Sequence, residues 1–169
     1  MLRYIKGDVT NPQGDGPRVI PHCCNDVGRF GAGVALAIAR RWPQVKDLYL
    51  AWYRSDPSVL ANDSGDTCEV TSRMSLGESQ LIKVEPNVWV VNIVGQHGVG
   101  MGSGGRPPIR YDALKKGIKA TYRWANIHKA EVHTPRLGSG LAGGHWGNIV
   151  AILKKEIDDK GVDVVVYDL

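Results

Sequence analysis

Apolar and polar positions follow two different periods along the chain. Short apolar runs bounded by turn residues predict buried strands at residues 19–24, 81–84, 88–94, 131–134 and 162–167. The polar segment 55–79 predicts a loop that holds an irregular strand around Cys68-Glu69-Val70. Only Glu85-Pro86-Asn87 separates the second run from the third, so these two runs predict an antiparallel pair.

Three other stretches show helical spacing. An alanine-rich stretch over 32–42 predicts a helix that is stopped by Pro43. Residues 111–126 carry apolar side chains four positions apart, which lie on one face of a helix. A last helix ends at Gly161 and is marked by four apolar residues, Ile149, Ile152, Leu153 and Ile157.

The alternation of strands with helices predicts an α/β fold. Apart from the turn at Pro86, the connections are too long for hairpins, which favours parallel pairing. We expect a three-layer α/β/α sandwich, with a mixed, largely parallel central sheet that helices cover on both faces. No repeat or change in composition divides the chain, so residues 1–169 are expected to form a single domain.

The composition is that of an ordinary globular protein, with 43% apolar and 22% charged residues among 169. No apolar run reaches the roughly 18 residues that span a bilayer, and the first residues lack the apolar segment of a secretory signal. Three cysteines, with Cys23 and Cys24 adjacent, favour reduced thiols over a disulfide framework or a zinc site. We therefore expect a cytoplasmic protein without membrane contact and without a bound metal.

The net charge of +4 comes from basic residues that are scattered in pairs, such as Arg40-Arg41. Such pairs are typical of solvated helix faces; the alternative is a modest positive field that attracts an anionic ligand. The sequence lacks a basic stripe interleaved with aromatic residues, so it predicts no sequence-specific nucleic-acid partner.

Glycine is unusually frequent, with 21 of 169 residues against an average usage of about 7%. Three glycine clusters lie where a predicted strand leads toward a helix, at 28–33, 95–105 and 138–144. Glycine lets the backbone approach a phosphate closely and allows the positive φ that points successive N–H groups at one anion. The clusters leave two interpretations open, plain turns or a cradle for a phosphate or diphosphate.

A dinucleotide-binding fold is one alternative for the third cluster. The segment Gly138 to Gly143 matches G-x-G-x-x-G, and Asp168 lies at the end of the next strand, where a ribose-binding acid belongs. The other strands of that fold would then have to precede the motif, which reverses the usual order. A second match, Gly100 to Gly105, leads into Arg106-Pro107-Pro108 rather than a helix, and the absence of Gly-Lys-Ser/Thr excludes a P-loop.

Four segments carry a more specific signal. They are Lys6-Gly7-Asp8-Val9-Thr10 after an N-terminal strand; His22-Cys23-Cys24-Asn25-Asp26 followed by Gly31-Ala32-Gly33-Val34-Ala35; Arg106-Pro107-Pro108-Ile109-Arg110-Tyr111-Asp112-Ala113-Leu114; and Pro135-Arg136-Leu137-Gly138-Ser139-Gly140-Leu141-Ala142-Gly143-Gly144-His145-Trp146. In this order and spacing the chain resembles a macrodomain, the α/β module that binds ADP-ribose. The last segment and the ending Val166-Tyr167-Asp168-Leu169 resemble most the terminal ADP-ribose glycohydrolases and ADP-ribose 1″-phosphate phosphatases.

The resemblance implies how adenine would be recognised. Asp8 would accept a hydrogen bond from the adenine amino group, beside a backbone contact from Val9 and the apolar Leu169. A carboxylate is an acceptor only, so this contact suits adenine and rejects a guanine or hypoxanthine carbonyl. The ordinary alternative for Asp8 is an acid that caps a turn or a helix.

The resemblance also implies contacts to the rest of the ligand. Asn25 would hydrogen-bond the distal ribose hydroxyls. The backbone N–H groups of Gly31, Ala32, Gly33 and Val34 would face the diphosphate from one side. A second loop would close over it from the other side, built from Arg136, Leu137, Gly138, Ser139, Gly140, Leu141 and Ala142.

Catalytic residues are less evident. The glycohydrolases of the subgroup that this chain resembles use a nucleophilic Lys, together with an Asp in the second glycine loop. Here Gln96 and Ala142 stand at the matching positions, and neither can form the covalent intermediate or transfer a proton. Asn25, Asp26 and His145 are the nearest candidates, and His145 is also explained as a helix-terminal histidine without a catalytic duty.

Two further points complete the expected chemistry. His22 lies inside an apolar strand, so a hydrogen-bonded core histidine is the favoured interpretation over a proton-transfer role. If the substrate's own diphosphate helped to activate the attacking water, the reaction would need no strong base from the protein.

The resemblance implies a monomeric hydrolase that binds ADP-ribose, or an ADP-ribosylated macromolecule, and needs no cofactor. It would remove a substituent from the distal ribose: a protein or nucleic-acid adduct, or the phosphate of ADP-ribose 1″-phosphate. The alternatives are a non-catalytic ADP-ribose reader and an O-acetyl-ADP-ribose deacetylase.

Overall fold

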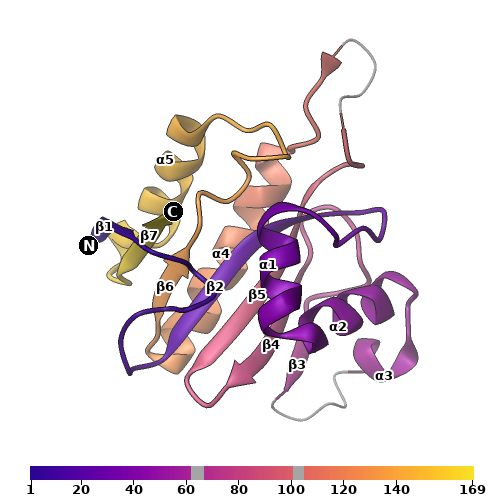
Figure 1. Ribbon diagram of the computed structural model, residues 1–169, viewed down its shortest axis with the longest axis horizontal. Helices are drawn as coiled ribbons and strands as arrows, with labels where there is room; N and C mark the ends of the chain where they lie inside the picture. The colour runs from indigo at the N-terminus through magenta and orange to yellow at the C-terminus, as the bar shows by residue number, and fades with distance from the viewer. Residues whose placement is uncertain (62–66, 101–104) are drawn as a thin grey trace.

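A computed structural model describes residues 1–61, 67–100 and 105–169 of the chain. Its centre is a seven-stranded sheet with the strand order β1-β7-β6-β2-β5-β4-β3 (Figure 1). The strands are β1 (Leu2–Lys6), β2 (Arg18–Asn25), β3 (Cys68–Val70), β4 (Ser79–Glu85), β5 (Val88–Gln96), β6 (Glu131–Thr134) and β7 (Val164–Asp168).

The sheet is mixed and largely parallel, as the sequence predicts. The strands from β1 to β5 in this order pair in parallel, and β4 and β3 add two antiparallel strands at one side. The antiparallel pair on either side of Pro86 is confirmed as β4 and β5. Since the parallel strands point the same way, their carboxyl ends share one edge of the sheet.

Helices cover both faces of the sheet (Figure 1). They are α1 (Gly33–Arg41), α2 (Pro43–Tyr53), α3 (Pro57–Leu60), α4 (Tyr111–His128) and α5 (Trp146–Glu156), followed by a short 3₁₀ turn η2 (Asp158–Lys160). The helices α1 to α3 lie on one face, and α4 and α5 lie on the other. The expected three-layer sandwich is therefore confirmed.

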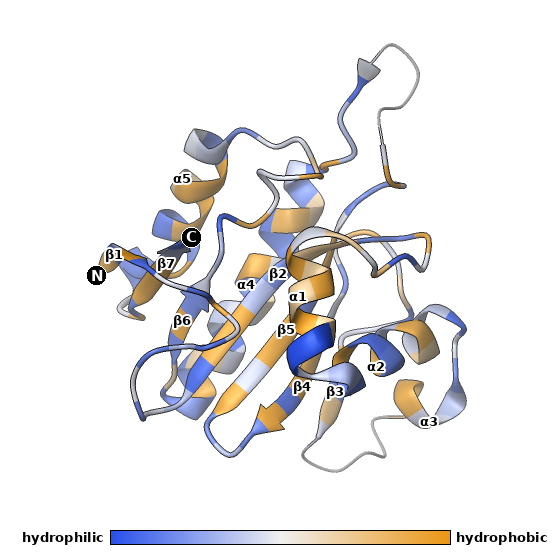
Figure 2. Cartoon of the chain, viewed as in Figure 1, coloured by the Kyte–Doolittle hydropathy of each residue, from blue (hydrophilic) through white to orange (hydrophobic). Residues whose placement is uncertain are grey.

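Each central strand contributes to two separate cores, because successive side chains point to opposite faces. In β2, Val19 packs in the core under α4 and α5, and Ile20 packs in the core under α1 and α2. All nine residues of β5 are buried, and most of the strand is coloured as hydrophobic in Figure 2, although it also holds the buried polar residues Asn92 and Gln96. Both faces of the sheet are thus used for packing, and the carboxyl edge is left for function.

Two helices are missing from the sequence prediction, and the end of the last helix differs from it. Pro43 does end α1, but it is also the first residue of α2, a position where its missing N–H costs nothing. The short α3 begins at Pro57 in the same way, capped by the carboxylate of Asp56. The last helix ends at Glu156 rather than at Gly161, which instead follows η2 with a φ of 91°.

A chain of buried amides ties the middle of the sheet together. The His22 ring donates from Nε2 to Asn92 Oδ1, and Asn92 Nδ2 donates to Gln80 Oε1 at 3.0 Å. Gln80 Nε2 in turn donates to the Leu48 carbonyl oxygen of α2 at 2.9 Å. His22 is therefore a hydrogen-bonded core histidine, as its apolar context indicates, and it plays no part in the edge chemistry.

The three cysteine thiols are free, and Cys23 and Cys24 directly precede the last residue of β2. Burial raises the pKa of the Cys23 thiol to about 12, and it also raises the pKa of the Cys24 thiol well above its ordinary value. Protonated, buried thiols are poor nucleophiles. Within the described ranges, no helix has the length and apolar character needed to cross a membrane.

The buried His22 predicts an acid-sensitive contribution to stability. Burial lowers its pKa from 6.5 to about 4, against the opposing effect of Asn92. Between these values the unfolded chain binds a proton that the folded chain excludes, so stability falls as the pH falls through this window. His22→Gln keeps a donor toward Asn92 and does not titrate. Urea unfolding at pH 7, 5.5 and 4 should show a pH-dependent loss smaller by roughly 3 kcal/mol in the variant than in the parent.

The comparison uses the difference between the two proteins, so the titration of other histidines cancels. Equal losses of stability in parent and variant between pH 7 and pH 4 would contradict this account of His22.

Candidate functional site

Loops that follow neighbouring strands form a row along the carboxyl edge of the sheet. In spatial order the row begins with Asp8 after β1 and Leu169 after β7. It continues with residues 135–145 after β6, residues 26–32 after β2 and residues 97–100 after β5. With strands about 4.8 Å apart, the four spacings from β1 to β5 span roughly 19 Å. The edge can therefore accommodate an elongated ligand.

The first end of the row holds Asp8 and Leu169 close together. Lys6 lies opposite Asp168 in the sheet, and the Gly7 N–H donates to the Asp168 carbonyl oxygen at 2.8 Å. Asp8 Oδ1 accepts hydrogen bonds from the Thr10 N–H at 2.9 Å and the Thr10 hydroxyl at 2.7 Å. No described residue donates to Oδ2, so one carboxylate oxygen is left available. Val9 is buried beneath it, whereas the Leu169 side chain is almost fully exposed.

Arg136 forms an unexpected cluster beside this end. Its guanidinium donates to both carboxylate oxygens of Asp168, at 2.6 and 3.2 Å. It also lies over the rings of Tyr4 and Trp146, 5.4 and 5.3 Å from their centroids. Arg136 holds the pKa of the Asp168 carboxyl below its ordinary value. The charge of this arginine is thus paired within the protein, and its place in the ligand site stays a prediction.

The two glycine loops face each other across the middle of the row. A Cβ placed on Gly33 would lie 3.5 Å from Leu141 Cδ1, although the two residues are far apart in sequence. Gly33 has a φ of 58°, a left-handed conformation that disfavours a side chain. Residues 31–34 and Leu141 are exposed, so both loops line an open space between them.

The helices that follow these loops have uncapped N-termini. No side chain caps α1 at Ala32 or α5 at His145. The first N–H groups of a helix lack intrahelical partners and attract negative charge when no side chain caps them. The middle of the row is therefore suited to an anion, and the predicted residues from both loops are brought together there.

The second glycine loop is held by close backbone contacts. Gly144 donates to the Gly138 carbonyl oxygen at 2.7 Å, and a Cβ on Gly144 would lie 2.5 Å from that oxygen. Ser139 donates its hydroxyl to the Arg136 carbonyl oxygen at 2.6 Å, and Leu137 is buried beneath the loop. These contacts make the loop a rigid wall of the site.

Two glycines of the second loop, Gly138 and Gly143, adopt a left-handed conformation, with φ of 76° and 75°. Gly140 has an ordinary φ and no atom within 4 Å of an added Cβ. Because this side of the loop is open, a side chain at position 140 would affect a bound ligand and would not disturb the packing of the loop.

Asn25 is buried and organises the first glycine loop. Its Oδ1 accepts from the Val27 N–H at 3.0 Å, the Arg29 N–H at 3.1 Å and the Tyr49 hydroxyl at 2.9 Å. Its Nδ2 donates to the Arg29 carbonyl oxygen at 2.6 Å. One Nδ2 hydrogen is left for a ligand. Contact with the distal ribose therefore stays a prediction, and the amide has a clear structural task besides.

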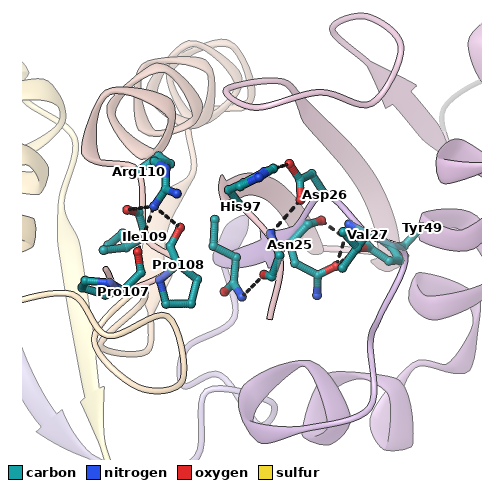
Figure 3. A network of polar contacts seen from close by, with 11 residues as sticks. Asn25, Asp26, Val27, Tyr49, His97, Pro107, Pro108, Ile109 and Arg110 are labelled. Carbon is teal, nitrogen blue, oxygen red and sulfur yellow. Dashed lines mark hydrogen bonds and ion pairs between the residues drawn. The ribbon is translucent and has the colours of Figure 1, made fainter. Parts of the chain in front are cut away.

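The far end of the row holds a carboxylate–imidazole pair that the sequence did not reveal (Figure 3). Asp26 Oδ2 lies 2.7 Å from His97 Nδ1, and Asp26 Oδ1 accepts the Gly98 N–H at 2.8 Å. Burial favours the protonated carboxyl, but Gly98 and His97 outweigh it and lower the pKa of Asp26 below its ordinary value. Asp26 is among the residues that the sequence predicts, whereas His97 is not, because the two residues lie 71 positions apart. Both residues come just after apolar runs that predict strands, 19–24 and 88–94, and this shared position was the signal that could have found the pair.

Gln96 and Ala142, the residues at the positions matching a Lys/Asp pair, both make structural contacts. Gln96 is buried, and its Nε2 donates to the Gly98 carbonyl oxygen at 3.0 Å. Ala142 is buried too, and its carbonyl oxygen accepts the Ile109 N–H at 3.0 Å. His145 stands at the start of α5, where its N–H donates to the Tyr111 hydroxyl and its ring bonds no described residue.

A hollow of about 370 Å³ adjoins the second glycine loop and is lined by Arg106, Pro107, Ile109, Arg110, Tyr111 and Asp112. Arg110 uses its guanidinium to fix the local backbone, donating to three successive carbonyl oxygens from Pro107 to Ile109 (Figure 3). The predicted cluster 95–105 lies partly outside the described residues, at 101–104. In the described parts of the chain, no three His, Cys, Asp or Glu side chains gather in a metal-binding group.

No family model matches the chain. The chain is 30% identical over 177 residues to Chromodomain-helicase-DNA-binding protein 1-like from Mus musculus, covering 98% of this chain and 17% of that protein. It is 26% identical over 165 residues to an ADP-ribose 1″-phosphate phosphatase from Meyerozyma guilliermondii, covering 91% and 93% of the two chains. The chain thus spans about one-sixth of the length of the helicase relatives that it matches.

Solved structures match over the whole chain. A protein of unknown function from Bacteroides thetaiotaomicron is 41% identical with a TM-score of 0.87, covering 100% of this chain and 98% of that one. A macrodomain protein from Streptomyces coelicolor is 36% identical with a TM-score of 0.80, covering 100% and 99%. DarTG from Thermosipho africanus, solved in complex with ADP-ribose, is 14% identical with a TM-score of 0.71, covering 98% and 41%. This last likeness is one of fold.

The second glycine loop predicts a contrast between two of its glycines. Gly144→Ala should lower the free energy of unfolding by about 1–3 kcal/mol, because its Cβ collides with a backbone oxygen and with Ile109. Gly140→Val should change it by less than about 0.5 kcal/mol, since the site is open. Urea unfolding of both variants checks the contrast. A Gly140→Val variant as unstable as Gly144→Ala would show that the loop packs differently.

Proposed function

Since the chain belongs to the macrodomain family, and its curated relatives place it with the ADP-ribose 1″-phosphate phosphatase-like subgroup, we propose that it binds ADP-ribose along the carboxyl edge of its sheet. We further propose that it hydrolyses a substituent on the distal ribose. The observation that carries the proposal is the order of the edge loops. Recognition groups suited to each part of the ligand follow one another along five neighbouring parallel strands.

The adenine would lie at the first end of the row. Asp8 Oδ2 has no donor among the described residues, and it would accept the exocyclic amino group. Asp8 Oδ1 is fixed by Thr10, so the free oxygen is held in one orientation. Leu169 is exposed beside it and would cover apolar ring surface, losing contact with water in the process.

The diphosphate would lie between the facing glycine loops. The uncapped N-terminus of α1, and the N–H groups of residues 31–34 and 140–142, would donate to its oxygens, while the Ser139 N–H is held by the Arg136 carbonyl oxygen. The exposed Leu141 and Val34 side chains would close over the ribose and phosphate chain. The distal ribose then falls beside Asn25 and the segment that follows β5.

Two activities fit this placement. Hydrolysis is supported by relatives named ADP-ribose 1″-phosphate phosphatase, at 26% identity or less. A non-catalytic reader is supported by Gln96 and Ala142, which replace the Lys/Asp pair of the glycohydrolases that the chain resembles. We favour hydrolysis, because the far end of the row holds ionisable groups that a reader does not need.

Turnover separates the two activities. The protein is incubated with glutamate- and serine-linked ADP-ribosylated protein, ADP-ribosylated DNA, ADP-ribose 1″-phosphate and O-acetyl-ADP-ribose, and the products are identified by mass spectrometry. Release of ADP-ribose from at least one substrate is expected. Clear binding without turnover of any of them would identify a reader.

Adenine recognition gives a quantitative prediction. Calorimetry should detect ADP-ribose binding that is stronger than binding of AMP and that GDP-ribose does not reproduce. Asp8→Ala should weaken ADP-ribose binding by roughly 1–3 kcal/mol, or about 5- to 150-fold in Kd, because the amino group loses its acceptor.

Asp15→Ala is the matched control for this variant. It removes the same charge from an exposed position whose backbone oxygen is bound by Asn87, at the opposite edge of the sheet. Equal affinities for ADP-ribose and GDP-ribose, or a loss of affinity shared by both variants, would rule out Asp8 as the adenine acceptor.

The open side of Gly140 tests the diphosphate cradle. Gly140→Val places a branched side chain where the diphosphate would approach, without disturbing the loop itself. We expect at least a tenfold rise in the Kd for ADP-ribose at an unchanged thermal midpoint. A folded variant that binds as well as the parent would leave residues 31–34 as the only cradle.

The remaining expectations stay predictions. They concern a single-domain monomer in the cytoplasm that acts without a cofactor or a metal.

A further inference from the structure

We propose that His97 is the general base of the hydrolysis and that Asp26 is its positioning residue; this inference rests on the proposed function. The pair is built at the edge of the sheet, with Asp26 Oδ2 2.7 Å from His97 Nδ1. The His97 side chain is 63% exposed, whereas that of Asp26 is 18% exposed. A mostly covered acid thus holds an imidazole whose other side faces solvent.

The strand pairing makes this arrangement specific. Asn25 and Gln96 lie opposite each other at the ends of β2 and β5, and the next residue of each strand supplies one member of the pair. The Asp26 carboxylate uses its second oxygen to accept the Gly98 N–H. The backbone of His97 is fixed from the other side, where its N–H donates to the Pro108 carbonyl oxygen at 2.8 Å. Figure 3 shows both Asp26 contacts converging on this short segment.

The carboxylate also determines the tautomer of the ring. A deprotonated carboxylate only accepts hydrogen bonds, so the Nδ1 atom that faces it carries the hydrogen. Nε2 is then left with a lone pair on the exposed side of the ring. An imidazole held in this way by a carboxylate is oriented to take a proton through Nε2.

The position of the pair along the row matches the reacting end of the ligand. Asp26 opens the segment that continues into residues 31–34, and Asn25 fixes that segment through Val27 and Arg29. Adenine would lie at the opposite end, beside β1 and β7. With the diphosphate between the glycine loops, the distal ribose extends toward β5 and His97.

The other four histidines do not offer this chemistry. Two are buried in hydrogen-bonded positions: His22 with Asn92, and His133 between Tyr167 and Glu131. His128 stacks on Trp89 near the amino end of β5, at the opposite edge of the sheet. His145 lacks a carboxylate partner among the described residues.

The reaction balances with water as the only co-reactant. The water oxygen bonds to the electrophilic atom, C1″ of a glycosidic linkage or phosphorus of a 1″-phosphate, and the bond from that atom to the leaving oxygen breaks. His97 Nε2 takes one proton from the water as the bond forms. The same proton then passes to the leaving oxygen, which restores neutral His97.

The inference is tested with the substrate that the full-length parent turns over fastest in the panel described above. His97→Gln should lower kcat at least 100-fold, while calorimetry gives a Kd for ADP-ribose within twofold of the parent. Added imidazole should restore part of the turnover of His97→Ala, because it replaces the missing base. Asp26→Asn should lower kcat at least tenfold with little change in KM, since the ring loses its orienting charge.

His128→Gln is the matched control, and it should keep the kcat of the parent. Thermal midpoints show that each variant is folded. Turnover by His97→Gln at the parental rate would overturn the role of His97 and leave the proposed hydrolase intact. A parent that binds ADP-ribose but hydrolyses nothing overturns the catalytic role and identifies a reader, and a parent that does not bind ADP-ribose overturns both proposals.

Discussion

The parallel pairing of β2 with β5 is the constraint on which the site depends. It places Asn25 opposite Gln96, so that the residues that follow both strands emerge at the same edge. The register is fixed inside the core, where His22 lies opposite Asn92 and donates to it. A slip by one residue would bury both polar groups without partners, at a cost of several kcal/mol. The buried hydrogen bond therefore fixes the position of the chemistry at the edge.

The two covered faces explain why function is confined to that edge. The side chains of β2, β5 and β7 alternate between two cores, one under α1 and α2 and one under α4 and α5. Both faces of these central strands are therefore occupied by packing. The carboxyl edge of the sheet, however, presents a different loop after each parallel strand, and each loop can vary without disturbing the core. One rigid framework thus holds several short recognition segments in a fixed order.

Sequence reasoning predicts the strands, the layers and the glycine loops, because these depend on local pattern. It misses α2, whose apolar positions follow Pro43, since a proline ends one helix and begins the next. It does not tell which glycines of the second loop are left-handed, Gly138 and Gly143, because loop φ values depend on contacts between loops. It finds Asp26 but not His97, because their contact exists only once two distant strands pair.

The charges near the glycine loops suggest how an anion is bound there. Arg136 is paired with Asp168 and lies over two aromatic rings, and Arg110 is used to fix its own backbone. Neither arginine is free to neutralise a diphosphate. In the proposed site the diphosphate would then be bound mainly by N–H groups and helix dipoles, which are fixed by the fold. The ionisable pair of Asp26 and His97 lies beyond it at the far end of the row, where the proposed reaction moves a proton.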